Sequence, residues 1–354
     1  GISTDRGLLA VAPVAQSARA VRIIEGRTYH LRSSTPWRHG GMTNLYESDD
    51  HHGRYWIIRT PLPALQLGTP SQQQAAYRQF EREGTILKGL DHPGIVWCEG
   101  FEKRNPFEQF MVVEPLATDL ESAAGSFLPP QVADIGIQIS GVLEYLSQRD
   151  PPIVHRDIKP ANLMYDGNRL IRIIDFGLAR WVDERNPKKQ DTYLAQSEGF
   201  SPPEQAHGEG QTGPDSDVYA LGVTLLTLLS GVRSRPRPPD RASPARVVRT
   251  ADDLAQEIVD PGKRRQSKPL LEILARATQY DRQRRYPDGG ALRLALAQLA
   301  KAEGYRLTDP GRTCPYCRKK VGFTANFCRY CGSPIRRDAF EARERLLRQG
   351  LLYL

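Results

Sequence analysis

The chain has 354 residues, of which 39% are hydrophobic, and it carries a formal net charge of +8 at pH 7. This length excludes a single small domain and fits one two-lobed domain of about 270–300 residues with an appendage. The strongest apolar run, residues 218–229, is shorter than the roughly 18 to 20 residues of a membrane span, so it predicts a buried helix instead, and no membrane span is expected in this chain.

The first part of the chain alternates short apolar segments with turn residues, a pattern typical of antiparallel strands. Residues 1–20 are weakly patterned, and we expect a flexible N-terminal arm there. Strands are expected at Val21–Ile24, Tyr29–Leu31, Leu45–Ser48 and Tyr55–Arg59. Residues 71–90 have helical spacing with Ser71 as the expected N-cap, and two more strands are expected at 95–101 and 110–114.

From residue 130 the pattern becomes mainly helical, and one apolar stripe runs from Val132 to Leu146. Two polar segments, residues 181–202 and 233–249, are expected to be loops. The second carries six arginines among several prolines. This composition favours a solvated surface loop, and the alternative is a docking site for an acidic partner.

One stretch carries the residue types of phosphoryl-transfer chemistry. It reads His155-Arg156-Asp157-Ile158-Lys159-Pro160-Ala161-Asn162-Leu163, and Asp175-Phe176-Gly177 begins thirteen residues after Asn162. At this spacing the two motifs resemble the catalytic loop and the metal-binding motif of eukaryotic-type, bacterial-like Ser/Thr protein kinases. The resemblance implies an α+β, two-lobed kinase domain over residues 21–302, with a β-rich N-lobe at 21–113 and a helical C-lobe at 117–302.

The resemblance also implies the catalytic roles. Asp157 would orient the acceptor hydroxyl and receive its proton, and Lys159, which is typical of the Ser/Thr class, would sit near the transferring phosphate. Asn162 and Asp175 would hold Mg²⁺, a hard cation that prefers oxygen ligands. We interpret His155 as a buried structural brace rather than a base.

Further landmarks of the kinase family follow in collinear order. Glu83 lies in the helix whose glutamate normally pairs with a strand lysine, and Glu114-Pro115-Leu116 resembles the hinge that meets adenine. Ser201-Pro202-Pro203-Glu204 resembles the end of the activation segment, and Arg285 matches the arginine that pairs with its glutamate. The residues assigned to ATP by resemblance are Gly40, Gly41, Leu45, Ile57, Arg59, Glu83, Glu114, Leu116 and Leu163.

Two positions depart from the family pattern. Arg59 stands where the strand lysine is expected, and arginine is bulkier and forks its donors differently. The glycine-rich loop is reduced to Gly40 and Gly41, although such glycines let backbone amides approach phosphate closely. Three explanations stay open: an active kinase that uses Arg59, a pseudokinase, and an introduced Lys→Arg change at residue 59.

The predicted activation segment contains candidate regulatory residues. Arg156 precedes Asp157, and in related kinases such an arginine receives a phosphate on this segment. Thr192 is the first candidate acceptor, with Tyr193 behind it. Ser197 is a second candidate, and it also occupies the place of a residue that contacts the catalytic loop in the family.

Four of the five cysteines lie within 18 residues near the C-terminus. Cys314, Cys317, Cys328 and Cys331 form two Cys-x-x-Cys pairs, which resemble a zinc ribbon and imply a structural Zn²⁺ held by four thiolates. The alternatives are reduced cysteines without a ligand and a redox or iron centre. Such a metal pattern indicates a reducing compartment, so we expect a cytoplasmic protein.

The sequence therefore predicts an ATP- and Mg²⁺-dependent Ser/Thr kinase with a protein substrate, followed by a zinc ribbon at residues 303–337 and a C-terminal helix at 338–354. The ribbon is basic and contains interleaved aromatic residues, which leaves nucleic-acid binding open, but a protein-docking role is favoured. The candidate partners are a regulatory protein and an opposing phosphatase. The competing class is a pseudokinase that serves as a signalling scaffold.

Overall fold

The structure is a computed structural model. It describes residues 21–37, 43–63, 68–166, 170–182, 199–206, 212–232 and 250–308, together with the backbone of residues 38–39, 311–313 and 320–322. The predicted N-terminal arm, most of the two predicted loops and the predicted C-terminal helix lie outside these residues.

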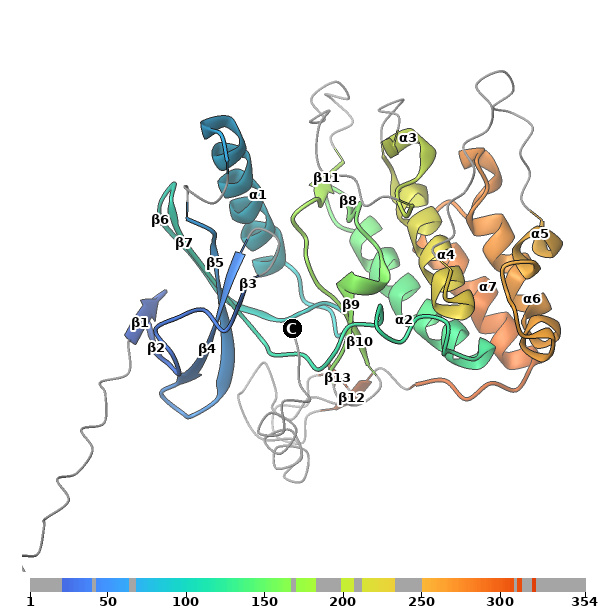
Figure 1. Cartoon of the computed structure of the whole chain (residues 1–354), viewed down its shortest axis with the longest axis horizontal. Helices are drawn as coiled ribbons and strands as arrows, with labels where there is room; N and C mark the ends of the chain where they lie inside the picture. The colour runs from blue at the N-terminus through green and yellow to red at the C-terminus, as the bar shows by residue number, and fades with distance from the viewer. Residues whose placement is uncertain are drawn as a thin grey trace, which may run out of the picture.

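A mixed group of short and long strands builds one antiparallel sheet in the N-terminal lobe (Figure 1). The strands are β1 (Val21–Ile24), β2 (Arg27–Leu31), β3 (Arg38–His39), β4 (Thr43–Asp50), β5 (Tyr55–Pro61), β6 (Cys98–Asn105) and β7 (Glu108–Val113). Their order is β1-β2-β4-β5-β7-β6, and β3 pairs with β4 beside β2.

The side chains of this sheet alternate between two cores, as the period of a strand requires. Ile58 and Val112 lie in one cluster with Ile24 of β1. Their neighbours Ile57 and Val113 lie in the main core. The sheet is therefore buried on both faces, and the main core joins it to the C-terminal lobe.

The β1–β2 hairpin folds back onto the far edge of the same sheet. Glu25 at its turn donates its backbone N–H to Glu102 of β6 at 2.6 Å and pairs with Lys88. Arg104 of β6 donates to the carbonyl of Ile23. Gly100 of β6 leaves room for this approach, because a Cβ there would lie 3.2 Å from the Glu25 carboxylate.

Helix α1 (Pro70–Lys88) packs against β6, β5 and β7. Thr69 is its N-cap and forms a capping box with Gln72, and Pro70 occupies the first turn. The predicted N-cap Ser71 is therefore wrong by two residues. Proline at the first helical position explains the shift, because its fixed φ already suits a helix.

The C-terminal lobe is built from helices. They are α2 (Pro129–Ser147), α3 (Pro203–Ala206), α4 (Pro214–Ser230), α5 (Ala251–Ala255), α6 (Pro261–Ala277) and α7 (Gly289–Ala302). The prediction that residues 218–229 form a buried helix is confirmed, since every one of them is buried within α4. Gly289 lets α7 approach α2, because a Cβ there would lie 2.5 Å from the Cβ of Leu143.

Two small two-stranded sheets lie at the junction of the lobes. They are β8 (Ile153–Val154) with β11 (Arg180–Trp181), and β9 (Leu163–Tyr165) with β10 (Ile171–Ile173). The predicted strand at 95–101 is only partly right, since β6 begins at Cys98. Ile95 instead forms a parallel bridge with Ile173 of β10, and this pairing ties the segment after α1 to the C-terminal lobe.

Beyond α7, β12 (Gly311–Thr313) pairs antiparallel with β13 (Lys320–Gly322). The predicted zinc ligands lie outside the described residues. In the part of the chain that the structure describes, none of the helices has both the length and the apolarity of a membrane span.

Candidate active site

The predicted catalytic loop runs from β8 to β9 through a short 3₁₀ turn at Pro160–Asn162. Asp157 is buried there, and its Oδ2 accepts hydrogen bonds from Lys159 Nζ at 2.9 Å and Asn162 Nδ2 at 2.8 Å. The same Asn162 nitrogen donates to the backbone carbonyl of Asp157 at 2.9 Å. Three of the four predicted catalytic side chains are thus bonded together, and Asp157 is held in one orientation.

Helix α4 supports this loop from behind. The carboxylate of Asp217 in its first turn accepts the backbone N–H groups of His155 and Arg156 at 2.7 and 2.8 Å. Burial raises the pKa of Asp217 to about 7, although these two donors oppose the shift. Thr224, two turns further on, donates its hydroxyl to the carbonyl of Ile158 at 3.1 Å.

His155 has the surroundings of a structural residue. Its side chain is fully buried, and its ring meets the ring of Phe176 edge-on with centroids 4.6 Å apart. Burial lowers the pKa of His155 to about 4, so the imidazole is neutral near pH 7. These surroundings support the interpretation of His155 as a brace.

Asp175, the fourth predicted catalytic residue, lies two residues beyond the end of β10. The backbone N–H of Ile174 donates to the carbonyl of Asn162 at 3.0 Å, which places the two predicted magnesium ligands on bonded segments. Asp175 has a φ of +61°, and Arg156 has a φ of +71°. Positive φ is uncommon for residues other than glycine, and strained backbone of this kind concentrates at functional sites.

Arg59 on β5 and Glu83 on α1 form a two-armed ion pair. The Nη1–Oε1 and Nη2–Oε2 distances are 2.5 and 3.3 Å, and both side chains are largely buried. Burial alone would lower the pKa of Arg59, but the negative charges of Glu83 and Asp175 outweigh it and raise that pKa above its ordinary value. Arg59 is therefore a permanent cation, and its proposed partner Glu83 is confirmed by contact.

Glu83 also interacts across the lobes, because burial raises its pKa while the positive charge of Arg59 and the backbone N–H of Phe176 oppose that rise. The strand residue, the helix residue and the segment of Asp175 thus meet at one place. This contact was not expected from the sequence, since nothing in the spacing of Glu83 and Phe176 reports a long-range backbone bond.

The apolar residues assigned to ATP are all buried in the main core, which extends through both lobes. They are Leu45, Ile57, Leu116 and Leu163. Ile57 pairs with Val113 across β5 and β7 and so lies beside the connection between the lobes. Gly40 and Gly41, also assigned to ATP, lie outside the described residues.

The side chain of the predicted hinge residue Glu114 is bonded within the protein. Its carboxylate accepts the backbone N–H of Trp97 at 2.8 Å and lies 3.5 Å from Arg172. Arg172 on β10 also donates to the carbonyl of Pro93 at 2.5 Å. The sequence analysis did not identify Arg172. Its position within the apolar run 170–173 could have indicated a buried ion pair, because an unpaired charge is disfavoured there.

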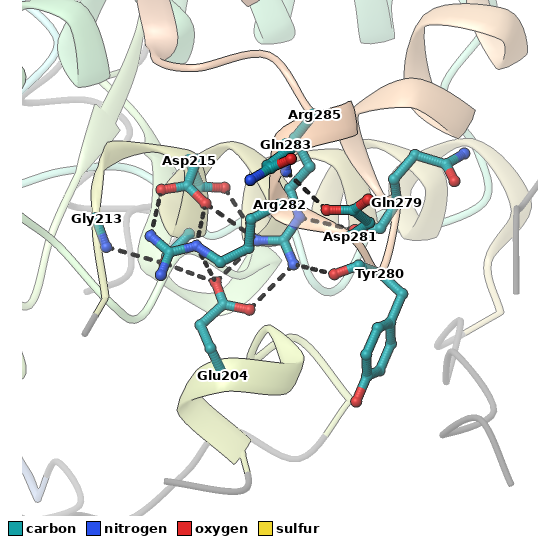
Figure 2. A network of polar contacts seen from close by, with 10 residues as sticks. Glu204, Gly213, Asp215, Gln279, Tyr280, Asp281, Arg282, Gln283 and Arg285 are labelled. Carbon is teal, nitrogen blue, oxygen red and sulfur yellow. Dashed lines mark hydrogen bonds and ion pairs between the residues drawn. The ribbon is translucent and has the colours of Figure 1, made fainter. Parts of the chain in front are cut away.

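The predicted end of the activation segment is anchored by a buried network (Figure 2). Arg285 donates to both carboxylate oxygens of Glu204 at 2.8 and 3.0 Å, which confirms their predicted pairing. Arg282 and Asp215 form a second two-armed pair beside it, which the sequence analysis did not anticipate. Thr192 and Ser197 lie outside the described residues, so the structure does not place the candidate phosphate acceptors.

One further contact joins this network to the catalytic loop. Gln205, next to Glu204, donates its side-chain amide to the carbonyl of Arg156 at 2.9 Å. The end of the activation segment is therefore bonded to the residue before Asp157.

A sheet-bearing lobe with an ion-paired strand and helix, set against a helical lobe that carries the Asp157 cluster, defines the protein kinase class. Residues 66–293 match the family model of the protein kinase domain, and the chain belongs to this family. The match begins after Arg59, so it does not include the two positions that depart from the pattern.

Among its relatives is Serine/threonine-protein kinase PknB of Mycobacterium leprae (strain TN), which is 28% identical over 253 residues, 67% of this chain and 39% of PknB. Serine/threonine-protein kinase PrkC of Bacillus subtilis (strain 168) is 31% identical over 197 residues, 54% of this chain and 29% of PrkC. Mitogen-activated protein kinase kinase 7 of Arabidopsis thaliana is 34% identical over 172 residues, 48% of this chain and 55% of that protein. The chain thus spans between about three tenths and just over half of these relatives' lengths.

Proposed function

We propose that this chain is a Ser/Thr protein kinase that transfers the γ-phosphate of ATP to a Ser or Thr hydroxyl of a protein. The observation that carries the proposal is the bonded cluster of Asp157, Lys159 and Asn162, with Asp175 on the adjoining segment. The relatives named as serine/threonine-protein kinases support the same acceptor class.

In this mechanism Asp157 accepts the proton of the substrate hydroxyl as that oxygen attacks the γ-phosphorus. Its bonds to Lys159 and Asn162 fix its rotamer, so little orientation entropy is lost in the transition state. The ammonium of Lys159 adds positive charge where negative charge collects on the transferring phosphate.

The residues present fit a divalent cation. The amide nitrogen of Asn162 donates two hydrogen bonds to Asp157. The amide oxygen is therefore the Asn162 atom that can bind the cation. Asp175 supplies carboxylate oxygen, and one of its oxygens accepts the backbone N–H of Gly177 at 3.1 Å. Such hard oxygen donors suit Mg²⁺, which when bound would neutralise charge on the phosphates.

Arg59 takes the place of the usual lysine in this proposal. Its two-armed pair with Glu83 holds α1 against the sheet, and its charge acts on the same region as Asp175. In this proposal Arg59 is the cation that positions α1. It binds the phosphates of ATP more weakly than a lysine would.

The test is autophosphorylation with labelled ATP and Mg²⁺, in which Asp175→Ala sets the background. Phosphate incorporation above that background on Ser or Thr supports the kinase. If neither the parent nor an Arg59→Lys protein exceeds it while both remain folded, the pseudokinase scaffold becomes the better explanation.

A structural zinc site is the second proposal for this chain. In the sequence, Cys314 and Cys317 lie between β12 and β13, which pair antiparallel, and two Cys-x-x-Cys pairs are typical ligands of a structural zinc. Cys328 and Cys331 would complete the tetrahedron. We expect elemental analysis to find one zinc per chain, and we expect Cys314→Ser to lose it. A zinc ribbon folded in this way would serve protein docking.

A further inference from the structure

The chain beyond α7 turns back onto the C-terminal lobe. Gly304 has a φ of +66°, and the N–H of Tyr305 donates to the carbonyl of Ala300 at 2.8 Å, which is the 6→1 bond of a Schellman motif. Tyr305 then packs against the main core. The orange trace after α7 in Figure 1 runs back along this lobe toward β12.

Thr308 fastens this returning segment to α2. Its backbone N–H donates to Asp134 Oδ1 at 2.7 Å, and its hydroxyl donates to Oδ2 at 2.6 Å. Both oxygens of one carboxylate are therefore engaged by a single residue 174 positions away. Hydrogen bonds to a charged acceptor are about twice as strong as neutral ones, so this is a specific anchor rather than a passing contact.

The anchor continues toward the catalytic segment. Gln138, one turn further along α2, donates to Asp134 Oδ2 at 3.1 Å and accepts the backbone N–H of Ile171 at 3.0 Å. Ile171 is the first residue of β10, and Asp175 follows β10 by two residues. A continuous chain of hydrogen bonds thus joins residue 308 to the strand that leads to Asp175.

We infer that Asp134 is an intramolecular docking site that, through Thr308, holds the paired strands β12 and β13 of this chain against the C-terminal lobe. Gly311, the first residue of β12, is three residues beyond Thr308, so at about 3.3–3.6 Å per residue it lies within roughly 11 Å of the anchor. Thr308 lies beyond the family match, which ends at residue 293.

The chain offers a matched control for the anchor chemistry. Thr250 donates both its backbone N–H and its hydroxyl to Asp253 at 2.8 Å, at the start of α5. Asp253→Ala therefore removes the same pair of bonds without touching residues 303–308. Thr308→Ser keeps both donors of the proposed anchor, and Thr308→Val removes only the hydroxyl.

The experiment measures amide relaxation by NMR on the full, zinc-loaded chain. In the parent, the amides of β12 and β13 should tumble with the correlation time of the kinase lobe. Asp134→Ala should shorten that time at least twofold for β12 and β13 while α4 is unchanged, Thr308→Val should have a smaller effect, and Thr308→Ser and Asp253→Ala should match the parent.

Two outcomes overturn the inference. One is a β12–β13 hairpin that already tumbles faster than the lobe in the parent, and the other is a correlation time that Asp134→Ala leaves unchanged. Hydrogen exchange of the Thr308 amide shows that the bond was broken, with about tenfold faster exchange expected. These readouts do not involve phosphoryl transfer, so they stand or fall separately from the proposed kinase activity.

Discussion

Replacing Arg59 by lysine should make the protein less stable and more active. Arg59 makes two bonds to Glu83, at 2.5 and 3.3 Å, and its guanidinium carbon lies 5.9 Å from the centre of the Phe80 ring. A lysine keeps the charge and one bond but loses the second arm and this ring contact. Loss of one hydrogen bond to a charged group costs about 1.5–3 kcal/mol, partly recovered by relaxation, so we expect a net loss of about 1–2 kcal/mol.

The gain in activity has the opposite origin. The donors of Arg59 are directed at Glu83, whereas a compact ammonium can contact Glu83 and a phosphate oxygen together. One added charge-assisted bond in the transition state corresponds to about a tenfold or greater rise in kcat/KM for ATP. Stability and rate should therefore move in opposite directions in the same variant.

Thermal unfolding and initial-rate kinetics measure the two effects. A Tm lower by about 2–6 °C is expected for Arg59→Lys. Arg59→Met is the control, because it strands a buried Glu83 and should cost about 3–5 kcal/mol. A lysine variant that is slower than the parent would show that Arg59 itself contacts the phosphates, and one with an unchanged Tm would show that the second arm contributes nothing.

Three further predictions concern the C-terminal lobe. Asp157→Asn should lower phosphate transfer by about 10²–10⁴-fold with little change in Tm, and an unaffected rate would remove Asp157 from the mechanism. Glu204→Ala should lower the unfolding free energy in urea by about 3–5 kcal/mol, because the buried Arg285 loses both of its short carboxylate bonds and, among carboxylates, keeps only the longer contact to Asp215 at 3.6 Å; a loss below about 1 kcal/mol would contradict this reading of Figure 2. The pKa of His155 is depressed from 6.5 to about 4, so the unfolded chain binds the proton first as the pH falls, and the stability that neutral His155 contributes is present above pH 6.5 and lost toward pH 4. The destabilisation caused by His155→Gln should therefore be about 3 kcal/mol smaller at pH 4 than at pH 7. Because the parent and variant proteins are compared at each pH, the opposite pH dependence of stability from Asp217 cancels. A destabilisation that does not change with pH would contradict the prediction.

The two-lobed fold could be predicted from the sequence because motif order fixes topology in this family. The strand periodicity before residue 60 and the buried run 218–229 each correspond to an observed element. The pairings of Arg59 with Glu83 and of Glu204 with Arg285 were also expected, since opposite charges at family positions have few other partners inside a core.

Other features could not be read from the sequence, because they depend on which distant segments meet. The carboxylate of Glu114 accepts the backbone N–H of Trp97 and pairs with Arg172, and no local sequence pattern predicts these contacts. The hydrogen bond between Thr308 and Asp134 joins two residue types that are common on protein surfaces, so neither residue indicates its partner. Ile95 has strand character but pairs with β10 rather than extending β6, since tertiary context decides between two available partners.

The β1–β2 hairpin has a practical consequence for the choice of fragments for expression. A fragment designed on the family match would start at residue 66 and discard β1 to β5, five of the seven described strands of the sheet. It would uncover Phe110 and Val112 and leave an edge of unpaired backbone, a surface prone to aggregation. A soluble expression fragment should begin before Val21, so that Glu25 can still reach Lys88 and Glu102, and it should continue past Thr308.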